Sequence, residues 1–242
     1  RSQVAGLNTE QVVALSSAQI IALTTVQITA MQLEDVAALT TAQVRQLETA
    51  DVAVLSTQQI AALTTAQVTS LSTAQVVALT TVQVAALQTD DLQALTATQI
   101  KALETADLVV LSTEQVSALT SAQVGALATE QVAKLSTGQV VALGADVSAL
   151  STAQVLALVT NQVQALTAAQ LQALSTVQLR VLETADIAAL STAQVVALST
   201  AQVSAMSSAQ IVSLSQLQVA ALETADLQAL TTAQIVALSV SQ

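Results

Sequence analysis

A leucine or methionine recurs at every eighth position of the chain, from Leu7 to Leu238. This spacing defines 29 successive octads, and only one of them, residues 143–149, has seven residues. A unit of eight residues is too short to bury its own apolar side, so neighbouring units must cover it. The repeat therefore predicts an array of stacked units. We number the positions of each octad from 1, the Leu or Met, to 8.

The octad has a constant polar and apolar pattern. Position 2 is usually Ser or Thr, position 5 is Gln or Asp in all 29 octads, position 6 is Val, Ile or Leu, and position 8 is mostly Ala. Positions 2–5 therefore read S/T-x-x-Q, as in residues 72–75 and 80–83. This is the pattern of a helix-capping box, and the apolar residues at positions 1 and 6 fit the hydrophobic staple that accompanies it.

The recurrence of this signal predicts that a helix begins in every octad. We expect an all-α fold, a solenoid or superhelix of very short capped helices with one helix per octad. One continuous helix is disfavoured because eight residues advance about 800°, which moves the Leu by about 80° per octad and leaves no fixed apolar stripe. A β-solenoid, suggested by the Val, Ile and Thr content, is the alternative fold. It would place Leu and Gln on the same face and the residues of positions 1 and 6 on opposite faces.

The octad pattern has no interruption that would mark a domain boundary. The chain has no Pro and only four Gly, and its composition does not shift along its length. We expect residues 1–242 to form a single continuous octapeptide-repeat array with no internal boundary. The sequence starts at Arg1 and ends at Gln242 in mid-octad, so we read it as a segment of a longer array. In the short octad, Gly144 stands where a tight turn would need it.

Seven octads have Asp in place of Gln at position 5. In these octads position 2 is never Ser or Thr, so we infer that the two positions touch and that the Asp serves as the cap acceptor. The dominant step between them is five octads, which suggests that five octads bring the chain back to the same side of the solenoid. The carboxylates are Asp35, Asp51, Asp91, Asp107, Asp146, Asp186 and Asp226. For Asp51, Asp107, Asp186 and Asp226 the sequence indicates no role beyond capping.

Composition excludes several functions. The formal net charge is −11 with five basic residues, so the chain lacks the clustered Lys and Arg that bind nucleic acid. No run of 18 apolar residues exists, so membrane insertion is not expected. The chain has no His, Cys or aromatic residue, and its few carboxylate pairs lack the oxygen density of a calcium loop. We expect no enzyme activity, and assign no catalytic, cofactor-binding or metal-ligating residue and no cofactor.

The sequence of residues 71–87, LSTAQVVALTTVQVAAL, resembles octapeptide arrays of very large bacterial secreted or surface proteins that are adhesin-like. The resemblance covers nearly the whole chain. It implies an extracellular or cell-surface location in a bacterium and a structural role. A haem-binding role is not supported, because Met31 and Met206 only replace Leu at position 1.

Two function classes remain. The first is a structural repeat protein, an extracellular stalk, spacer or filament-forming segment that associates end to end with further copies. The alternative is a binding module whose regular Ser and Thr rows, such as Thr73, Thr81 and Thr89, match a glycan, ice or a mineral. The two classes differ in whether the Thr residues of position 3 form one exposed plane or are scattered around the solenoid.

Overall fold

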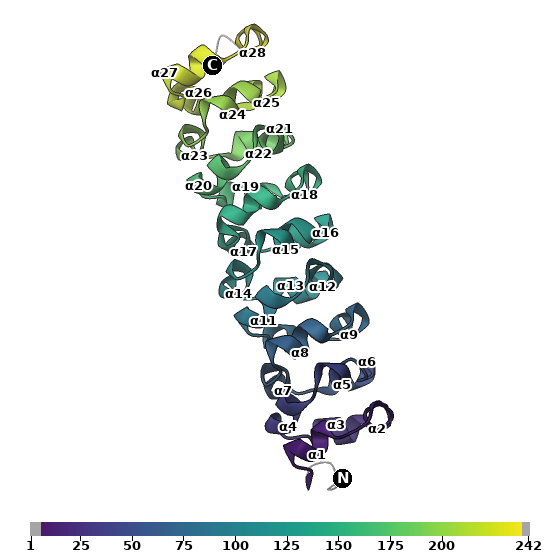
Figure 1. Cartoon of the computed structure of the whole chain (residues 1–242). Helices are drawn as coiled ribbons and strands as arrows, with labels where there is room; N and C mark the ends of the chain where they lie inside the picture. Colours follow the sequence, from purple (N-terminus) through teal and green to yellow (C-terminus); the bar gives the residue numbers. More distant parts are fainter. Residues whose placement is uncertain (1–5, 239–242) are drawn as a thin grey trace. The chain divides into compact units, whose positions relative to one another are not determined.

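The computed structural model describes residues 6–238, which are helical in almost every octad. The chain forms two compact units, Arg1–Leu119 (unit 1) and Thr120–Gln242 (unit 2). Figure 1 shows the short helices following one another along each unit. The octad pattern continues on both sides of the boundary between the units, and the single continuous array stays a prediction. No strand occurs in the described residues, so the all-α solenoid is confirmed and the β-solenoid is not supported.

The helices of unit 1 are α1 Thr9–Val13, α2 Ser17–Ile21, α3 Thr25–Thr29, α4 Leu33–Ala38, α5 Thr41–Val44, α6 Thr49–Val54, α7 Thr57–Ala61, α8 Thr65–Ser70, α9 Thr73–Val77, α10 Thr81–Ala85, α11 Thr89–Ala94, α12 Ala97–Ala102, α13 Thr105–Val109 and α14 Thr113–Ser117.

The helices of unit 2 are α15 Ser121–Ala126, α16 Thr129–Lys134, α17 Thr137–Ala142, the 3₁₀-helix η2 Gly144–Ala149, α18 Thr152–Leu156, α19 Thr160–Ala165, α20 Ala168–Ala173, α21 Thr176–Arg180, α22 Thr184–Ala189, α23 Thr192–Val196, α24 Thr200–Ala205, α25 Ser208–Ser213, α26 Gln216–Ala221, α27 Thr224–Ala229 and α28 Thr232–Ala237.

Each α-helix of the described residues begins at position 3 of its octad, where the capping box predicts. In α9 the cap Ser72 has extended backbone angles, φ −70° and ψ 159°, and its hydroxyl accepts from the Gln75 N–H at 3.2 Å. Gln75 Oε1 accepts in return from the Ser72 N–H at 2.9 Å. The preceding Leu71 is also extended, with φ −57° and ψ 136°. Two extended residues at positions 1 and 2 therefore end one helix and start the next in a new direction.

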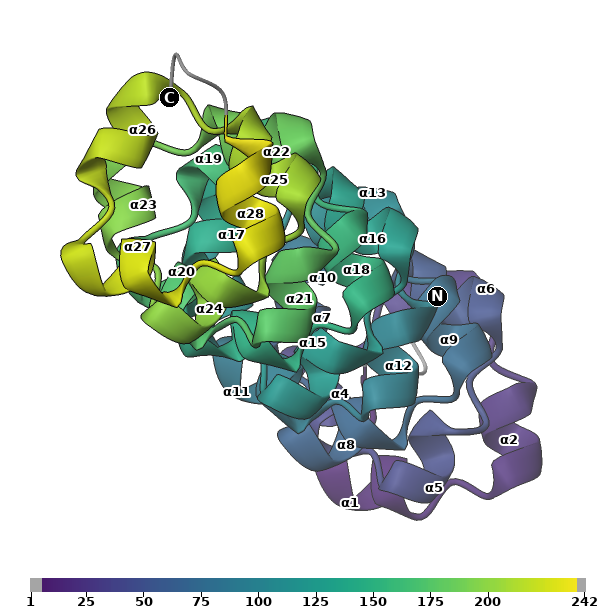
Figure 2. The ribbon, with the colours of Figure 1, turned by 90° about the horizontal axis from the view of Figure 1, so that it is seen from above.

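Three to four octads complete one turn of the coil in each unit. Helices three apart in the chain pack together, as α1 does with α4 and α22 with α25. Figure 2, seen from above, shows α22, α25 and α28 following one another in this way. Hydrogen bonds that join successive turns span 25 to 31 residues. A turn thus takes more than three and fewer than four octads.

The number of octads per turn corrects our interpretation of the spacing of five octads between octads that contain Asp. Five octads exceed one turn and fall short of two, so they do not return the chain to the same side of the coil. The physical reason is that the angle between successive helices determines the number of octads per turn. The spacing of the Asp residues along the sequence is independent of that angle.

The core consists of the side chains at positions 1 and 6, as the staple predicts. In the octad of α9, Leu71 is 6% and Val76 0% exposed, whereas Val77 at position 7 is 47% exposed. The same assignment holds at position 1 from Met31 to Leu230 and at position 6 from Val12 to Val219, where these side chains are buried. Each octad therefore adds two apolar side chains to a core shared with its neighbouring turns.

The seven-residue octad is accommodated locally in unit 2. Gly144 has φ +54°, a left-handed angle that favours glycine, and the chain continues as the 3₁₀-helix η2. The hydrogen bonds between turns that span the short octad are kept, with one residue fewer between donor and acceptor. Gln162 reaches the carbonyl groups 30 and 27 residues before it, whereas Gln75 reaches those 31 and 28 residues before. The deletion is thus absorbed within a single turn.

Candidate functional site

From Asp35 to Gln234 the fold buries the polar residue of position 5 in every octad except that of Asp146, which is half-buried. Gln67 in α8 is 2% exposed. Its Oε1 accepts from the N–H of Thr64 at 2.7 Å, which caps its own helix. Its Nε2 donates to the carbonyl oxygens of Val36 at 2.8 Å and Leu39 at 2.6 Å, in the previous turn of the coil. One amide thus caps a helix and links two turns.

These contacts satisfy a backbone group that the fold would otherwise leave without a donor. The carbonyl of position 1 belongs to an extended residue outside the helix, and it lies in the buried interior. A buried carbonyl without a partner costs about 1–3 kcal/mol. We call the series of such contacts the glutamine ladder. Its members with a bond to position 1 or 6 of an earlier turn are Gln43, Gln59, Gln67, Gln75, Gln83, Gln99, Gln115, Gln154, Gln162, Gln170, Gln178, Gln194, Gln202, Gln210, Gln218 and Gln234.

Octads without a cap hydroxyl keep the hydrogen bond that the position-5 glutamine makes to the cap N–H. Ala128 and Val159 stand at position 2 and have no hydroxyl to offer. Their N–H groups still donate to Oε1 of Gln131 and Gln162, at 2.7 and 2.8 Å. The half of the capping box that position 5 supplies is therefore kept where the other half is lost.

Asp51, Asp107, Asp186 and Asp226 lie at the same buried position and are 2–3% exposed. Each accepts from the backbone N–H of the Glu at position 2, at 3.0 Å for Asp107 and 3.2 Å for the other three. This confirms the expectation that the Asp serves as the cap acceptor and touches position 2. An ionised carboxylate has no hydrogen to donate, so these octads lack the link that glutamine makes to the previous turn.

In two Asp-containing octads the Asp carboxylate instead accepts a hydrogen bond from a hydroxyl group of an earlier turn. Thr65 Oγ1, at position 3 of the octad three before, donates to Asp91 Oδ1 at 2.9 Å. Ser121 makes the equivalent bond to Asp146 in unit 2. Burial raises the pKa of the Asp51, Asp91 and Asp107 carboxyl groups, because desolvation disfavours the charged form more than the hydrogen bonds favour it.

These shifts predict a pH dependence of stability. A carboxyl whose folded pKa exceeds its unfolded pKa stabilises the folded state below the unfolded value of about 3.9, and this contribution is lost as pH rises through the folded pKa. We expect Asp107→Asn to raise the free energy of unfolding at pH 7 and to change it little at pH 3. Urea titrations at several pH values measure both.

The matched control is Glu104→Gln, which removes the same charge from an exposed side chain of the same octad. It should give a smaller gain at pH 7, since it relieves only the repulsion between Glu104 and Asp107, which raises the Asp107 pKa less than burial does. Equal gains from the two variants would show that burial of Asp107 has no effect on its ionisation.

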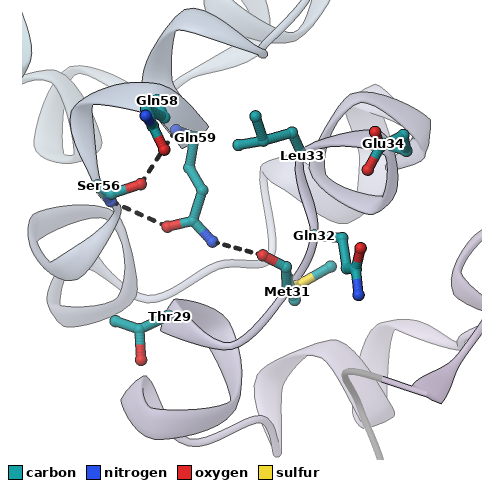
Figure 3. A pocket seen from close by; sticks show the side chains of 8 residues that line it. All are labelled: Thr29, Met31, Gln32, Leu33, Glu34, Ser56, Gln58 and Gln59. Carbon is teal, nitrogen blue, oxygen red and sulfur yellow. Dashed lines mark hydrogen bonds between the residues drawn. The ribbon is translucent and has the colours of Figure 1, made fainter.

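Shallow grooves lie where the ladder joins two turns. In unit 1 a groove of about 410 Å³ is lined by Thr29, Met31, Gln32, Leu33, Glu34, Ser56, Gln58 and Gln59. Figure 3 shows Gln59 reaching across it to the carbonyl of Met31, a bond of 3.0 Å. In unit 2 a groove of about 350 Å³ has the equivalent arrangement around Met206 and Gln234. Both grooves are therefore features of the repeat.

Each groove is lined by one charged side chain. Glu34 is the acidic side chain of the first groove, and Arg180 is the basic side chain of the second. Within residues 6–238 no three His, Cys, Asp or Glu residues gather closely enough to hold a metal ion. Over the same residues, no helix has both the length and the apolar character needed to cross a membrane.

The Thr residues of position 3 lie in the first turn of helices that point in different directions around the coil. Thr73, Thr81 and Thr89 begin α9, α10 and α11, which succeed one another within a single turn. Adjacent members of the row therefore face different sides, so they do not share one flat plane.

Sequence reasoning identified half of the role of position 5 and missed the other half. The capping box requires only an acceptor there, and Glu would serve as well as Gln. Yet Glu never occupies position 5 in the 29 octads. The exclusion of Glu was the available signal that the amide hydrogens of Gln are needed.

Comparison with known proteins identifies the repeat itself. The model of a family described as the ALTTAQ repeat matches nine overlapping segments that extend over nearly the whole chain: residues 2–25, 28–65, 44–81, 61–89, 84–121, 100–137, 144–176, 179–216 and 219–242. No curated protein matches the chain.

Proposed function

The chain belongs to the ALTTAQ repeat family, and from that premise we propose that it is a structural spacer, a stalk segment whose length is set by its number of octads. Its work is to hold other parts of an assembly apart at a fixed distance. The proposal requires a coil that extends by equal increments and whose turns are firmly joined.

The observation that supports this function most directly is the glutamine ladder. Every link joins residues 27 to 31 apart, so a turn is held by its immediate neighbours. The apolar contacts have the same range, because helices pack against those three further along the chain. Stability in such an array is a sum of repeat and nearest-neighbour terms. Octads can therefore be added or removed without rebuilding a distant contact.

The short octad supports the same function. A missing residue at 143–149 leaves the ladder intact on both sides, as the links of Gln154 and Gln162 demonstrate at 2.7 Å each to Leu127 and Leu135. A spacer needs such tolerance, whereas an active site built on a fixed geometry does not. We propose no catalytic role.

We place this spacer outside the cell, at a bacterial surface. The Cys-free, acidic and Thr-rich composition and the likeness of residues 71–87 to octapeptide arrays of surface proteins support the location. Labelling of intact producing cells with a membrane-impermeant amine reagent tests it. Labelling of Lys101 and Lys134 only after lysis would contradict it.

The spacer function predicts the outcome of deletions. Removal of residues 182–221, which are five complete octads of unit 2, should leave a folded protein that is shorter in proportion, because each remaining octad meets an equivalent neighbour. Circular dichroism melting and the maximum dimension from small-angle scattering measure the two properties.

The control is removal of residues 182–201, which cuts an octad in half and places a polar residue at each later core position. This smaller deletion should lower the melting temperature far more than the larger one. If the deletion of five octads unfolds unit 2, stability depends on long-range contacts and the spacer function is wrong.

A further inference from the structure

The groove around Met206 in unit 2 lies where three successive turns of the coil meet. Arg180 at the end of α21 lines one wall, Met206 lies in the link between α24 and α25, and Thr231 precedes α28. Helix α24 packs against α21, and α28 packs against α25, so these segments belong to consecutive turns. The groove has a volume of about 350 Å³, which is within the range of sites for small molecules.

Arg180 brings an unengaged positive charge to this groove. Its side chain is exposed and makes no hydrogen bond or ion pair with residues 6–238. Arg45 stands at the same position 7 in unit 1, and its Nε donates to the carbonyl of Ser70, 25 residues on, at 3.1 Å. The residue 25 positions after Arg180 is Ala205, which lines the groove and receives no such bond. All five N–H donors of Arg180 are therefore available to a ligand.

Three hydroxyl groups add further donors to the groove. The hydroxyl of Ser207 caps α25 by accepting from the N–H of Gln210 at 3.2 Å. The hydroxyl of Thr231 caps α28 in the same way, by accepting from the N–H of Gln234 at 3.3 Å. Neither hydroxyl donates to an acceptor among the described residues, and the half-buried Ser208 makes no side-chain hydrogen bond with them at all. The groove therefore presents hydrogen-bond donors around one cation.

The charge of the groove differs from that of its surroundings. Among the described residues no carboxylate lines it, and Glu183, three residues after Arg180, makes no ion pair with that side chain. The corresponding groove of unit 1 has Glu34 as its charged side chain. The chain as a whole carries a formal charge of −11 and repels anions at long range. An anion that binds in the groove of unit 2 is therefore held by local contacts.

We propose that this groove binds an acidic sugar, a hexuronate whose carboxylate pairs with the guanidinium of Arg180 and whose hydroxyl oxygens accept from the three hydroxyl groups. A planar carboxylate fits two parallel N–H donors of an arginine. One cation suits a monoanion better than a phosphate group, which carries nearly two charges at pH 7. The further donors favour a ligand with oxygens beyond the carboxylate, and Met206 and Ala205 offer apolar contact to the C–H groups of a sugar ring.

The ligand goes beyond the spacer function and does not depend on it. Isothermal titration calorimetry of the full chain at pH 7 and about 0.15 M salt tests the site with methyl glucuronide, methyl glucoside and acetate. We expect methyl glucuronide to bind with a Kd of about 1 mM, as is usual for a ligand of this size. The glucoside lacks the charge and acetate lacks the ring, so each should bind at least about tenfold more weakly.

Arg180→Gln should weaken the binding of methyl glucuronide at least about tenfold, because hydrogen bonds to a charged group are lost. Arg45→Gln is the matched control. It removes the same charge at the same position of unit 1, where Gln keeps an interturn bond such as that of Gln164 to the carbonyl of Ala189 at 3.3 Å, and it should leave the Kd unchanged. Circular dichroism melting establishes that both variants are folded.

Ser208→Ala tests the sugar separately from the charge. It removes one hydroxyl donor, so it should weaken methyl glucuronide about threefold and leave the weak binding of acetate as it was. No binding of methyl glucuronide, equally tight binding of the glucoside or of acetate, or equal losses from Arg180→Gln and Arg45→Gln would overturn the proposal. Tighter binding of inorganic sulfate than of methyl glucuronide would assign the groove to a compact oxyanion and overturn it as well. None of these outcomes bears on the spacer function, which the deletions test.

Discussion

Val76→Asp is expected to lower the free energy of unfolding of unit 1 by about 4 kcal/mol or more, because it buries an unpaired carboxylate in the core of the coil. Val76 at position 6 of the octad of α9 is 0% exposed. The loss should appear in urea titrations at pH 7 and should diminish at low pH, where the carboxyl is protonated.

The adjacent residue provides the control. Val77 at position 7 is 47% exposed, so the carboxylate of Val77→Asp stays in water. We expect a loss of at most about 1 kcal/mol for this variant, mainly from lower helix propensity. Similar losses at both positions would contradict the assignment of position 6 to the core.

Gln59→Glu is the second substitution with a large expected effect. It keeps the size of the side chain and the acceptor that caps α7, and it replaces the amide that donates to the carbonyls of Ile28 and Met31, each at 3.0 Å. A charged oxygen would then face two carbonyl oxygens in a buried site. We expect a loss of about 3 kcal/mol at pH 7, measured by urea unfolding.

Gln58→Glu is the matched control, one residue away on the exposed side of the same helix. It adds the same charge and should change stability by at most about 0.5 kcal/mol. Protonation of the new Glu at position 59 restores one donor, so acid should recover part of the loss in that variant alone. A loss at Gln59 no greater than at Gln58 would show that the ladder contributes nothing to stability.

The sequence alone determined where each helix begins and which side chains enter the core. The capping box and the staple act within about five residues, so their geometry depends little on the rest of the fold. Ser72, Gln75 and Val76 therefore take the positions that the octad predicts. For the same reason the Asp residues could be identified as cap acceptors, as Asp51 is for Glu48.

The prediction of a tight turn at Gly144 was correct. The prediction that five octads return the chain to the same side of the coil was wrong. A missing residue beside a glycine has a local consequence, the left-handed φ of +54°, which can be inferred without knowing the neighbours. The return of the chain to one side of a coil is a sum of rotations over several helices. Small differences at positions 1 and 2 accumulate in that sum, and the spacing of Asp octads carries no information about it.

Only the tertiary structure decided what the amide of position 5 binds. Gln67 meets Val36 and Leu39 because the chain completes one turn in 28 to 31 residues, and that distance follows from the direction in which two extended residues send each new helix. The local pattern fixes the acceptor half of the glutamine, since its partner is three residues away. The donor half depends on a carbonyl of another turn, whose place is set by packing of the whole coil.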